Sequence, residues 1–437
     1  MNHIPSSSGW KTFYRIWGGQ TVSLVGTAMS RFALMIWAYQ QTGSATTLAL
    51  LGFFNFGAIV LCSSFSGVVV DRIKRKTVML LSDTCAALMS AVILYLFTVG
   101  RLQIWHLYLL ETMTGMFEAF QYPAYQAAIT LLVPRSDFTR TSSLNSLSES
   151  SARVIAPVLA GLLLPAAGLK VVLMLDLLTF FAAFGTLLVS HIPQPEQADG
   201  SDLKENQVSL RAGWDFIRTR PGLICLIFLF ALINLFAGLT YYSIISPMIL
   251  ARSGNSTLAL SWVEASLGLG GIAGGLILSA WGGPKQKVKG LLLITGLSFI
   301  MGDGTFAFGR SLPFWVLAGF ISNLSVPFIS GPNQAIWQAK TPPELQGRVF
   351  ALRGMLQMIT IPIGYLAAGP LADHVFEPGM AAGGSLAGIF GWISGIGPGA
   401  GMGLMFACTA LGGLVTSIVG YSMKPLRYVE QDLPDAV

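Results

Sequence analysis

The chain has 437 residues, of which 53% are apolar and only 11% are charged, whereas roughly 25% of the residues in an ordinary soluble domain are charged. The mean hydropathy of +0.65 excludes a typical soluble domain and indicates a membrane protein. The formal charge of +6 does not indicate nucleic-acid binding, because the cations fall in short clusters between apolar runs and do not gather on one solvated face.

Apolar segments long enough to cross a bilayer as helices recur along the whole chain. We predict an all-α membrane protein with twelve transmembrane helices in two six-helix bundles. The predicted spans are 13–39, 46–70, 77–99, 104–128, 143–167, 171–191, 222–249, 258–281, 288–309, 313–338, 346–374 and 399–422.

The cations predict the orientation of these spans, because short loops rich in Lys and Arg remain in the cytoplasm. When both termini are placed in the cytoplasm, few of the 26 Lys and Arg residues face outward. The four that do are Arg101, Lys170, Arg252 and Arg310. We therefore predict that both termini are cytoplasmic.

One long polar segment divides the chain into halves of six spans each. We predict an N-terminal bundle over 1–190, a cytoplasmic linker over 191–221, and a C-terminal bundle with a cytoplasmic tail over 222–437. Within the linker, Leu210, Trp214 and Ile217 recur at helical spacing, which is typical of a helix lying on a membrane surface. The linker is interpreted as a tether that lets two halves move.

The loop between the second and third spans is densely charged. The segment GVVVDRIKRKTVML starts at Gly67, and its one acid, Asp71, precedes four cations. The rule that cytoplasmic loops are basic explains the cations but not Asp71. An acid at a helix end can pair with a cation or face a helix N-terminus in one conformation only. We predict a conformational latch formed by Gly67, Asp71, Arg72, Arg75 and Lys76.

Several ionisable residues fall inside predicted spans, where a charge costs at least ~2.5 kcal/mol and tends to face a cavity or a partner. They are Arg31, Glu111, Glu118, Glu149, Arg153, Asp176, Glu264 and Asp303. These charges either carry function or form static pairs that hold helices together, and both interpretations remain open for Arg153 with Glu149.

No cofactor or metal is expected. The four cysteines lie in apolar segments without metal-ligand spacing, and small core residues explain them. Span eight contains a run of glycines but lacks the Lys-Ser/Thr of a nucleotide-binding loop. This makes ATP an improbable energy source, and we expect a proton gradient to serve instead.

The charged loop resembles the signature of the major facilitator superfamily, in which a glycine, an acid and basic residues connect the second and third helices; Lys74 departs from it, since a glycine is usual there. Segments 123–164, 209–222, 333–355, 362–373 and 429–434 resemble the branch containing macrolide efflux proteins and enterobactin-type siderophore exporters. The resemblance covers nearly the whole chain. It implies a bacterial inner-membrane exporter driven by proton exchange, with two bundles rocking around a central cavity.

The fifth helix of facilitator antiporters often carries a Gly-Pro with paired small residues. Here Pro157 and Gly161 match that pattern, and Ala156 stands where the first glycine would be. A proline inside a helix favours a kink. The match supports antiport.

In the facilitator fold the first and fourth helices face one cavity, which implies a pair between Arg31 and Glu111. Glu118 lies nearly two turns deeper, where Arg153 of the fifth span is expected to approach it. Because proton coupling needs a carboxylate whose environment alternates, Glu118 and Glu111 are the predicted coupling residues. The same resemblance implies structural roles for Asp176 and Asp303 in peripheral spans.

The rest of the cavity is expected to be apolar and aromatic, as pockets for amphipathic compounds are. Periodicity does not separate cavity-facing from lipid-facing positions. The candidates for the substrate cavity are Trp37, Asn55, Phe117, Tyr122, Asn234, Tyr241, Asn323, Gln334 and Trp337. Residues 376–403 are glycine-rich and too broken for a confident helix, so we predict an interfacial or re-entrant loop on the outer side, or else a flexible surface loop.

Three hypotheses follow. The first is a proton-coupled exporter of amphipathic organic compounds, of drug, macrolide or siderophore class, in the bacterial inner membrane. The second is a lipid or lysolipid flippase on the same fold, and the third is a membrane sensor or assembly factor that transports nothing. An enzyme is not expected, because no nucleophile-base arrangement and no metal cluster is evident. The expected partners are a small amphipathic molecule, protons and the lipid bilayer, with the protein acting as a monomer and without nucleic acid.

Overall fold

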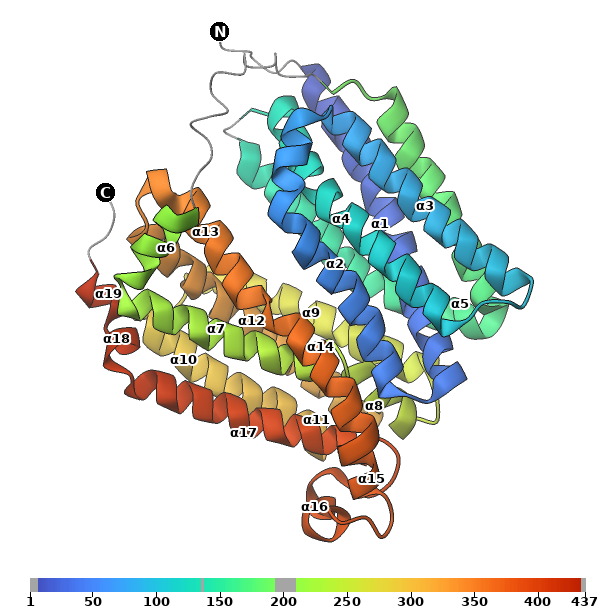
Figure 1. Ribbon diagram of the computed structural model, residues 1–437, viewed down its shortest axis with the longest axis vertical. Helices are drawn as coiled ribbons and strands as arrows, with labels where there is room; N and C mark the ends of the chain where they lie inside the picture. Colours follow the sequence, from blue (N-terminus) through green and yellow to red (C-terminus); the bar gives the residue numbers. More distant parts are fainter. Residues whose placement is uncertain (1–6, 135–136, 193–209, 434–437) are drawn as a thin grey trace. The chain divides into compact units, whose positions relative to one another are not determined.

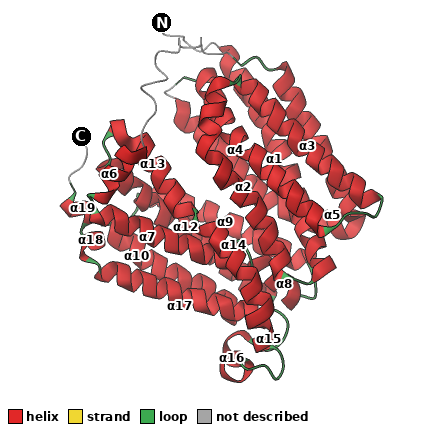
Figure 2. Cartoon of the chain, viewed as in Figure 1, coloured by secondary structure: helices red, strands yellow, loops and turns green. Residues whose placement is uncertain are grey.

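The computed structural model describes residues 7–134, 137–192 and 210–433, and these residues form helices and connecting loops without a strand (Figure 2). The chain forms two compact units. The first comprises Met1–Gly43 and Leu50–Gln197, and the second comprises Ser44–Ala49 and Ala198–Val437. Most of the predicted linker lies outside the described residues.

The first unit contains five long helices, which lie side by side in Figure 1. They are α1 (Ser7–Thr42), α2 (Ala45–Arg72), α3 (Arg75–Thr98), α4 (Ile104–Leu132) and α5 (Phe138–Val189). Gly168 interrupts α5 with φ 77°, a backbone conformation that glycine adopts without strain. The interruption separates α5 into two helical arms, which correspond to the predicted spans 143–167 and 171–191.

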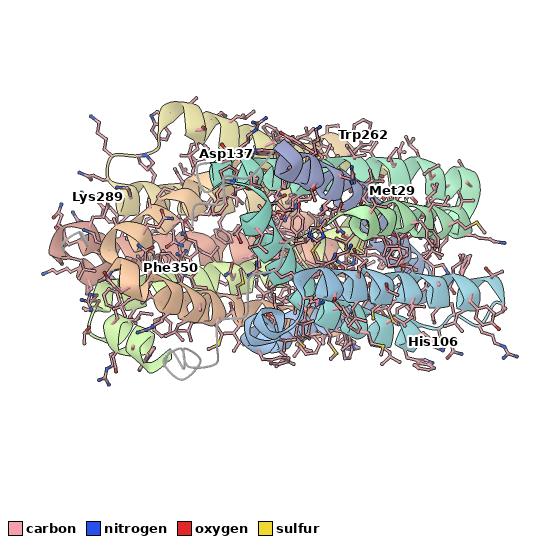
Figure 3. All side chains as sticks on the ribbon, turned by 90° about the horizontal axis from the view of Figure 1, so that it is seen from above. Met29, His106, Asp137, Trp262, Lys289 and Phe350 are labelled. Carbon is pink, nitrogen blue, oxygen red and sulfur yellow. The ribbon has the colours of Figure 1, made fainter. Side chains whose placement is uncertain are left out.

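Glycines on α1 allow close contact with α5. Gly19 lies against the side chain of Thr186, and Gly26 lies against that of Thr179. A Cβ atom at either glycine would collide with the threonine hydroxyl. The two glycines are seven residues apart and therefore share a helix face, so they form a packing seam of the small-residue type that membrane helices use. Along the same helix, Met29 is 5% exposed and lies among side chains between helices, whereas His106 of α4 lies at the edge of the molecule (Figure 3).

Two cations of the loop after α2 bind the ends of neighbouring helices. Lys76 donates from Nζ to the carbonyl oxygens of Leu188 and Ser190, each at 2.8 Å. Arg75 donates from Nη1 to the carbonyl oxygen of Ala127 at 2.8 Å. Cations at a helix C-terminus satisfy free carbonyls and oppose the helix dipole. The dense charge of this loop thus fastens the start of α3 to α4 and α5.

The second unit is built from more and shorter helices. In chain order they are α6 (Leu210–Arg218), α7 (Pro221–Leu239), α8 (Ile245–Arg252), α9 (Thr257–Trp281), α10 (Lys287–Ser298), the π-helix η2 (Phe299–Asp303), α11 (Gly304–Phe308), α12 (Leu312–Lys340), α13 (Pro343–Met358), α14 (Thr360–Leu371), the π-helix η3 (Ala372–Phe376), α15 (Glu377–Met380), α16 (Ala387–Ser394), α17 (Ala400–Ser422), α18 (Lys424–Arg427) and α19 (Val429–Asp432). The linker helix α6 buries Ile217, packs against α13 and leaves Trp214 exposed.

The glycine run of α9 forms a close helix contact. Gly270 and Gly274 lie against the backbone carbonyls of Phe320 and Leu324 on α12, at distances that leave no space for a Cβ atom. Gly271 and Gly275, on the other face of α9, have no atom within 4 Å of the position a Cβ would take. The glycines at 270 and 274 therefore serve backbone approach.

Asp303 ends η2 and is 1% exposed. Its carboxylate accepts hydrogen bonds from the hydroxyls of Tyr241 at 2.5 Å and Thr409 at 2.6 Å. Tyr241 is also 2.8 Å from the hydroxyl of Ser322. These bonds connect η2 with α12, α17 and the segment after α7.

Residues 376–403 form a folded cap containing α15 and α16, so the prediction that this segment is too broken for helix was wrong for those two stretches. Glu377 accepts hydrogen bonds from the backbone N–H groups of Gly399 at 2.9 Å and Met402 at 2.8 Å, which caps α17. Arg252 donates to the carbonyl oxygens of Gly399, Ser394, Gly309 and Phe306 at 2.6 to 3.3 Å. Burial lowers the pKa of Arg252 to about 10 while nearby Glu377 opposes the shift, so the guanidinium stays charged at neutral pH.

The first turn of α2 is part of the second unit, unlike the rest of this helix. Asp373 of η3 caps this turn. Its carboxylate accepts hydrogen bonds from the backbone N–H groups of Ala45 at 3.0 Å and Thr46 at 2.9 Å, and from the Ser44 hydroxyl at 2.6 Å. An acid from another part of the chain thus satisfies a helix N-terminus.

Among the described residues, ten helical stretches are long and apolar enough to cross a membrane. One of them, Arg140–Val189, has 50 residues, about twice what one crossing needs. The protein is therefore organised as a multi-pass membrane protein.

Candidate functional site

The first unit encloses a cavity of about 360 Å³ between α1, α3, α4 and α5. Small-molecule pockets in proteins have volumes of roughly 300–1,000 Å³. Its apolar lining includes Trp17, Leu24, Leu34, Ile93 and Phe180. Its charged lining residues are Arg31, Asp83, Glu111, Glu118, Glu149 and Asp176.

Arg31 of α1 lies between two carboxylates of α4. Its Nη2 is 2.5 Å from Oε1 of Glu118 and 3.9 Å from Oε2 of Glu111. The two glutamates are seven residues apart in one helix, so both project from the same face toward Arg31. One guanidinium can balance only one carboxylate, so the group holds one acid more than it holds cations. We refer to Arg31, Glu111 and Glu118 as the ion triad.

The predicted pair of Arg31 and Glu111 lies within ion-pair distance. The predicted partner of Glu118 was the wrong cation, because Arg31 binds this glutamate. Arg153 was expected to approach Glu118. In the structure Arg153 is exposed and forms no ion pair with any described residue. Glu149 lines the cavity without pairing with Arg153 in the described part of the chain. The error arose because depth along a helix does not specify which way a side chain points.

A second polar group surrounds Asp83 of α3, which is 7% exposed and was not among the sequence candidates. Gln20 of α1 donates from Nε2 to Oδ2 of Asp83 at 2.9 Å, and Gln121 of α4 donates to Oδ1. Gln121 also lies 3.3 Å from Oε1 of Gln20. The sequence did contain the signal, because Asp83 is an acid inside the predicted span 77–99. We call Asp83, Gln20 and Gln121 the amide-acid group.

Asp176 lies on the cavity, although its span was expected to be peripheral. It accepts hydrogen bonds from the hydroxyls of Thr27 at 3.1 Å and Ser90 at 2.8 Å, and it is 3% exposed. The interruption of α5 at Gly168 lets its second arm return along α1, which places Asp176 there. The expected structural role agrees with these two bonds, and the packing of this span at the periphery of the fold stays a prediction.

One cavity wall holds a buried amide group that is only partly satisfied. Tyr125 donates its hydroxyl to Oδ1 of Asn145 at 3.0 Å, whereas the buried Nδ2 of Asn145 has no hydrogen-bond partner within the described part of the chain. Nearby, the hydroxyls of Thr21 and Ser148 are 2.7 Å apart. An unsatisfied buried amide is costly, so this donor is suited to a ligand or to water.

Of the other cavity candidates in the first unit, Tyr122 lines the cavity. Trp37 stacks edge-on against Phe97 with ring centroids 6.4 Å apart. Asn55 donates to the backbone oxygen of Glu111 at 3.4 Å, and Phe117 does not line this cavity.

The candidates in the second unit make contacts within that unit. Asn234 donates to the backbone oxygen of Gln357 at 2.9 Å. Arg353 donates to Gln334 at 2.9 Å and lies 5.3 Å above the ring of the buried Trp337. Tyr241 binds Asp303 as described above, and Asn323 is half-buried on α12.

The remaining predicted site residues are placed as follows. Gly67, Asp71 and Arg72 lie in the last turns of α2, but the structure does not describe their side chains. Pro157 and Gly161 are buried in the first arm of α5. Within the described residues, no group of three or more His, Cys, Asp or Glu side chains is arranged to hold a metal ion.

Residues 16–365 match the family model described as Major Facilitator Superfamily. The chain belongs to this superfamily. It is therefore a membrane transporter and not an enzyme. The predicted family resemblance is confirmed.

Curated relatives fall in the predicted branch. The chain is 29% identical over 378 residues to macrolide efflux protein A of Streptococcus pyogenes, a match that covers 84% of this chain and 91% of the relative. It is 24% identical over 349 residues to the enterobactin exporter EntS of Shigella boydii serotype 18, covering 78% of this chain and 80% of the relative.

A solved structure has the same fold. A bacterial homolog to the human lysosomal transporter Spinster superposes with a TM-score of 0.70 at 15% identity, covering 96% of this chain and 98% of the other. At this identity the likeness establishes the fold alone, which is that of Major Facilitator Superfamily transporters.

Proposed function

We propose that this protein exports amphipathic organic compounds across the bacterial inner membrane in exchange for protons, by alternating access. The observation that carries the proposal is the ion triad in a cavity of drug-binding size. The similarity to a macrolide efflux protein and an enterobactin exporter supports the direction of transport.

The ion triad suits proton coupling because one cation serves two acids. Arg31 holds Glu118 at 2.5 Å and Glu111 at 3.9 Å. A proton entering from outside neutralises one carboxylate, and Arg31 then pairs with the other. Release of that proton to the cytoplasm restores the negative charge. A proton moving inward through ~100 mV releases ~2.3 kcal/mol, which is available to drive an outward step of cargo.

Twelve crossings are consistent with the helices. The two arms of α5 on either side of Gly168 count as two crossings, and α4 adds another to the ten apolar stretches. An even number of crossings places both termini on one side, and the distribution of Lys and Arg favours the cytoplasm. We propose two six-helix bundles in a monomer, with a proton gradient as the energy source and no cofactor.

The test uses purified full-length protein in proteoliposomes with an internal pH dye. A proton gradient is imposed and macrolides, cationic dyes and siderophores are added one at a time. We expect compound-dependent proton movement, together with its loss in Glu118→Gln and its strong reduction in Glu111→Gln. Glu344→Gln, a change at an exposed acid of α13 in the second unit, is the matched control and should behave as wild type. Unchanged cargo-dependent proton movement in both cavity variants would refute the assignment.

A further inference from the structure

The two polar groups of the cavity differ in their charge balance. In the ion triad, Arg31 partly neutralises Glu111 and Glu118. Asp83 has no cation within ion-pair distance among the described residues, and its two bonds come from the neutral amides of Gln20 and Gln121. We propose that Asp83 binds the positively charged amine of the cargo, so that the transported compounds are amphipathic organic cations. This inference rests on the proposed export function and assigns its substrate class.

The geometry at Asp83 leaves it able to accept a further bond. A carboxylate has about four acceptor positions, and the two amide donors occupy one on each oxygen. The amides fix the direction of the carboxylate without supplying charge. An ionised carboxylate that is 7% exposed is unfavourable until a cation reaches it. An ammonium group entering the cavity supplies both the missing charge and an N–H donor.

The charge of the whole cavity favours the same class of cargo. Its lining contains five acids and one arginine. Arg31, the one cation among the described lining residues, already lies 2.5 Å from Glu118. An anionic siderophore would meet repulsion from the other acids, whereas a monocation is attracted by them. Of the cargo classes that the sequence left open, the cavity charge therefore favours cationic drugs and macrolides over anionic siderophores.

Other polar and aromatic side chains of the cavity suit the uncharged part of such a cargo molecule. The Nδ2 of Asn145, on the cavity lining, is buried and has no hydrogen-bond partner among the described residues. Nδ2 can only donate, so it calls for an acceptor oxygen on the ligand. Trp17 and Tyr122 line the cavity with Asp83, and aromatic rings add to the binding of organic cations. The cargo is therefore an amine with an apolar body and acceptor oxygens.

The alternative is that Asp83 is a protonated residue that only joins three helices. The experiment measures binding to detergent-purified full-length protein by equilibrium dialysis. The probes are radiolabelled tetraphenylphosphonium, a permanent cation, and a pair of macrolides that differ in one group, a secondary amine in one and its neutral N-acetyl amide in the other.

We expect wild type to bind the amine at least tenfold more tightly than the N-acetyl compound. Asp83→Asn, which keeps the shape of the group but removes its charge, should weaken binding of both cations at least tenfold and leave binding of the neutral compound unchanged. Asp83→Glu should restore part of the cation binding, which excludes misfolding as the cause. Glu344→Gln, a change at an exposed acid of α13 that does not line the cavity, is the control and should alter cation binding by less than threefold.

Equal affinity of wild type for the charged and neutral macrolides, or unchanged cation binding in Asp83→Asn, would overturn the inference. The proton assay separates this failure from a failure of the proposed function. Proton exchange that continues with neutral cargo would reject the Asp83 assignment and keep the exporter. Cation binding that depends on Asp83 without any cargo-linked proton movement would keep the assignment and reject proton exchange.

Discussion

Arg31 and Glu118 form an ion pair of 2.5 Å between the first and fourth helices of the first unit, inside a cavity that Asp83 also lines. The arginine side chain is 37% exposed and that of the glutamate is 32% exposed. A pair at this depth is neither fully solvated nor sealed. Its net contribution to stability is therefore expected to lie between that of an exposed pair and that of a fully buried one.

Removing Arg31 should be more harmful than removing the pair. In Arg31→Ala, Glu118 and Glu111 are left as two acids on one helix face without a cation, and we expect stability to fall by about 1–2 kcal/mol. The double variant Arg31→Ala/Glu118→Gln should recover part of this loss, because a single acid remains. Thermal unfolding in detergent measures both. If the stability loss of the double variant equals the sum of the losses in Arg31→Ala and Glu118→Gln, the two residues do not interact energetically.

The site was only partly predictable from the sequence. An acid or arginine inside an apolar span is a reliable signal, and it found Arg31, Glu111 and Glu118. The identity of partners was not predictable, because the rotation of one helix about its axis relative to another is not encoded in hydropathy. That is why Arg153 was assigned to Glu118.

The fold was more predictable than the site. The apolar spans locate the long helices, since segment length and hydropathy depend only on local sequence. The folded cap at 376–403 was missed because its order comes from distant groups. Arg252 binds four carbonyls there, and Glu377 caps α17. Because glycine has low helix propensity, the sequence of this glycine-rich segment does not predict its helices.

The two units use a common device for a buried acid. In the first unit, hydroxyls of Thr27 and Ser90 bind Asp176. In the second, hydroxyls of Tyr241 and Thr409 bind Asp303. Hydroxyl donors satisfy an acid without an added cation.

The contact between α9 and α12 should tolerate no side chain at Gly274. A Cβ atom there would meet the backbone of Leu324, which cannot move aside as a flexible side chain can. We expect Gly274→Val to lower stability by more than about 2 kcal/mol, measured as the midpoint of thermal aggregation in detergent. Gly271→Ala is the matched control on the open face of the same helix. It should be neutral or slightly stabilising. Equal behaviour of the two variants would contradict the close packing.

Arg252 should hold the cap together more strongly than its neighbour Arg310. Arg252 is half-buried and bonds to four carbonyls, whereas Arg310 is exposed and bonds to Gly391 and Trp392 at 3.3 Å. In Arg252→Ala these buried carbonyls lose their donor, so hydrogen exchange across 381–399 should accelerate at least tenfold. Arg310→Ala should change it by less than threefold. Similar protection in both variants would show that the glycine-rich backbone holds its own shape.

Lys76 should contribute to stability through the carbonyls at the end of α5, while Lys74 should not. Lys76 donates to Leu188 and Ser190, and Lys74 is an exposed residue at the start of α3 without a side-chain hydrogen bond in its capping position. We expect Lys76→Met to destabilise the first unit by about 0.5–1.5 kcal/mol, because the substitution keeps most of the apolar stem and removes the donor. Lys74→Met removes the same charge from the same loop and serves as the control. If both changes cost the same in thermal unfolding, loop charge alone is responsible. A loss confined to Lys76→Met would establish that this cation joins the start of α3 to the end of α5.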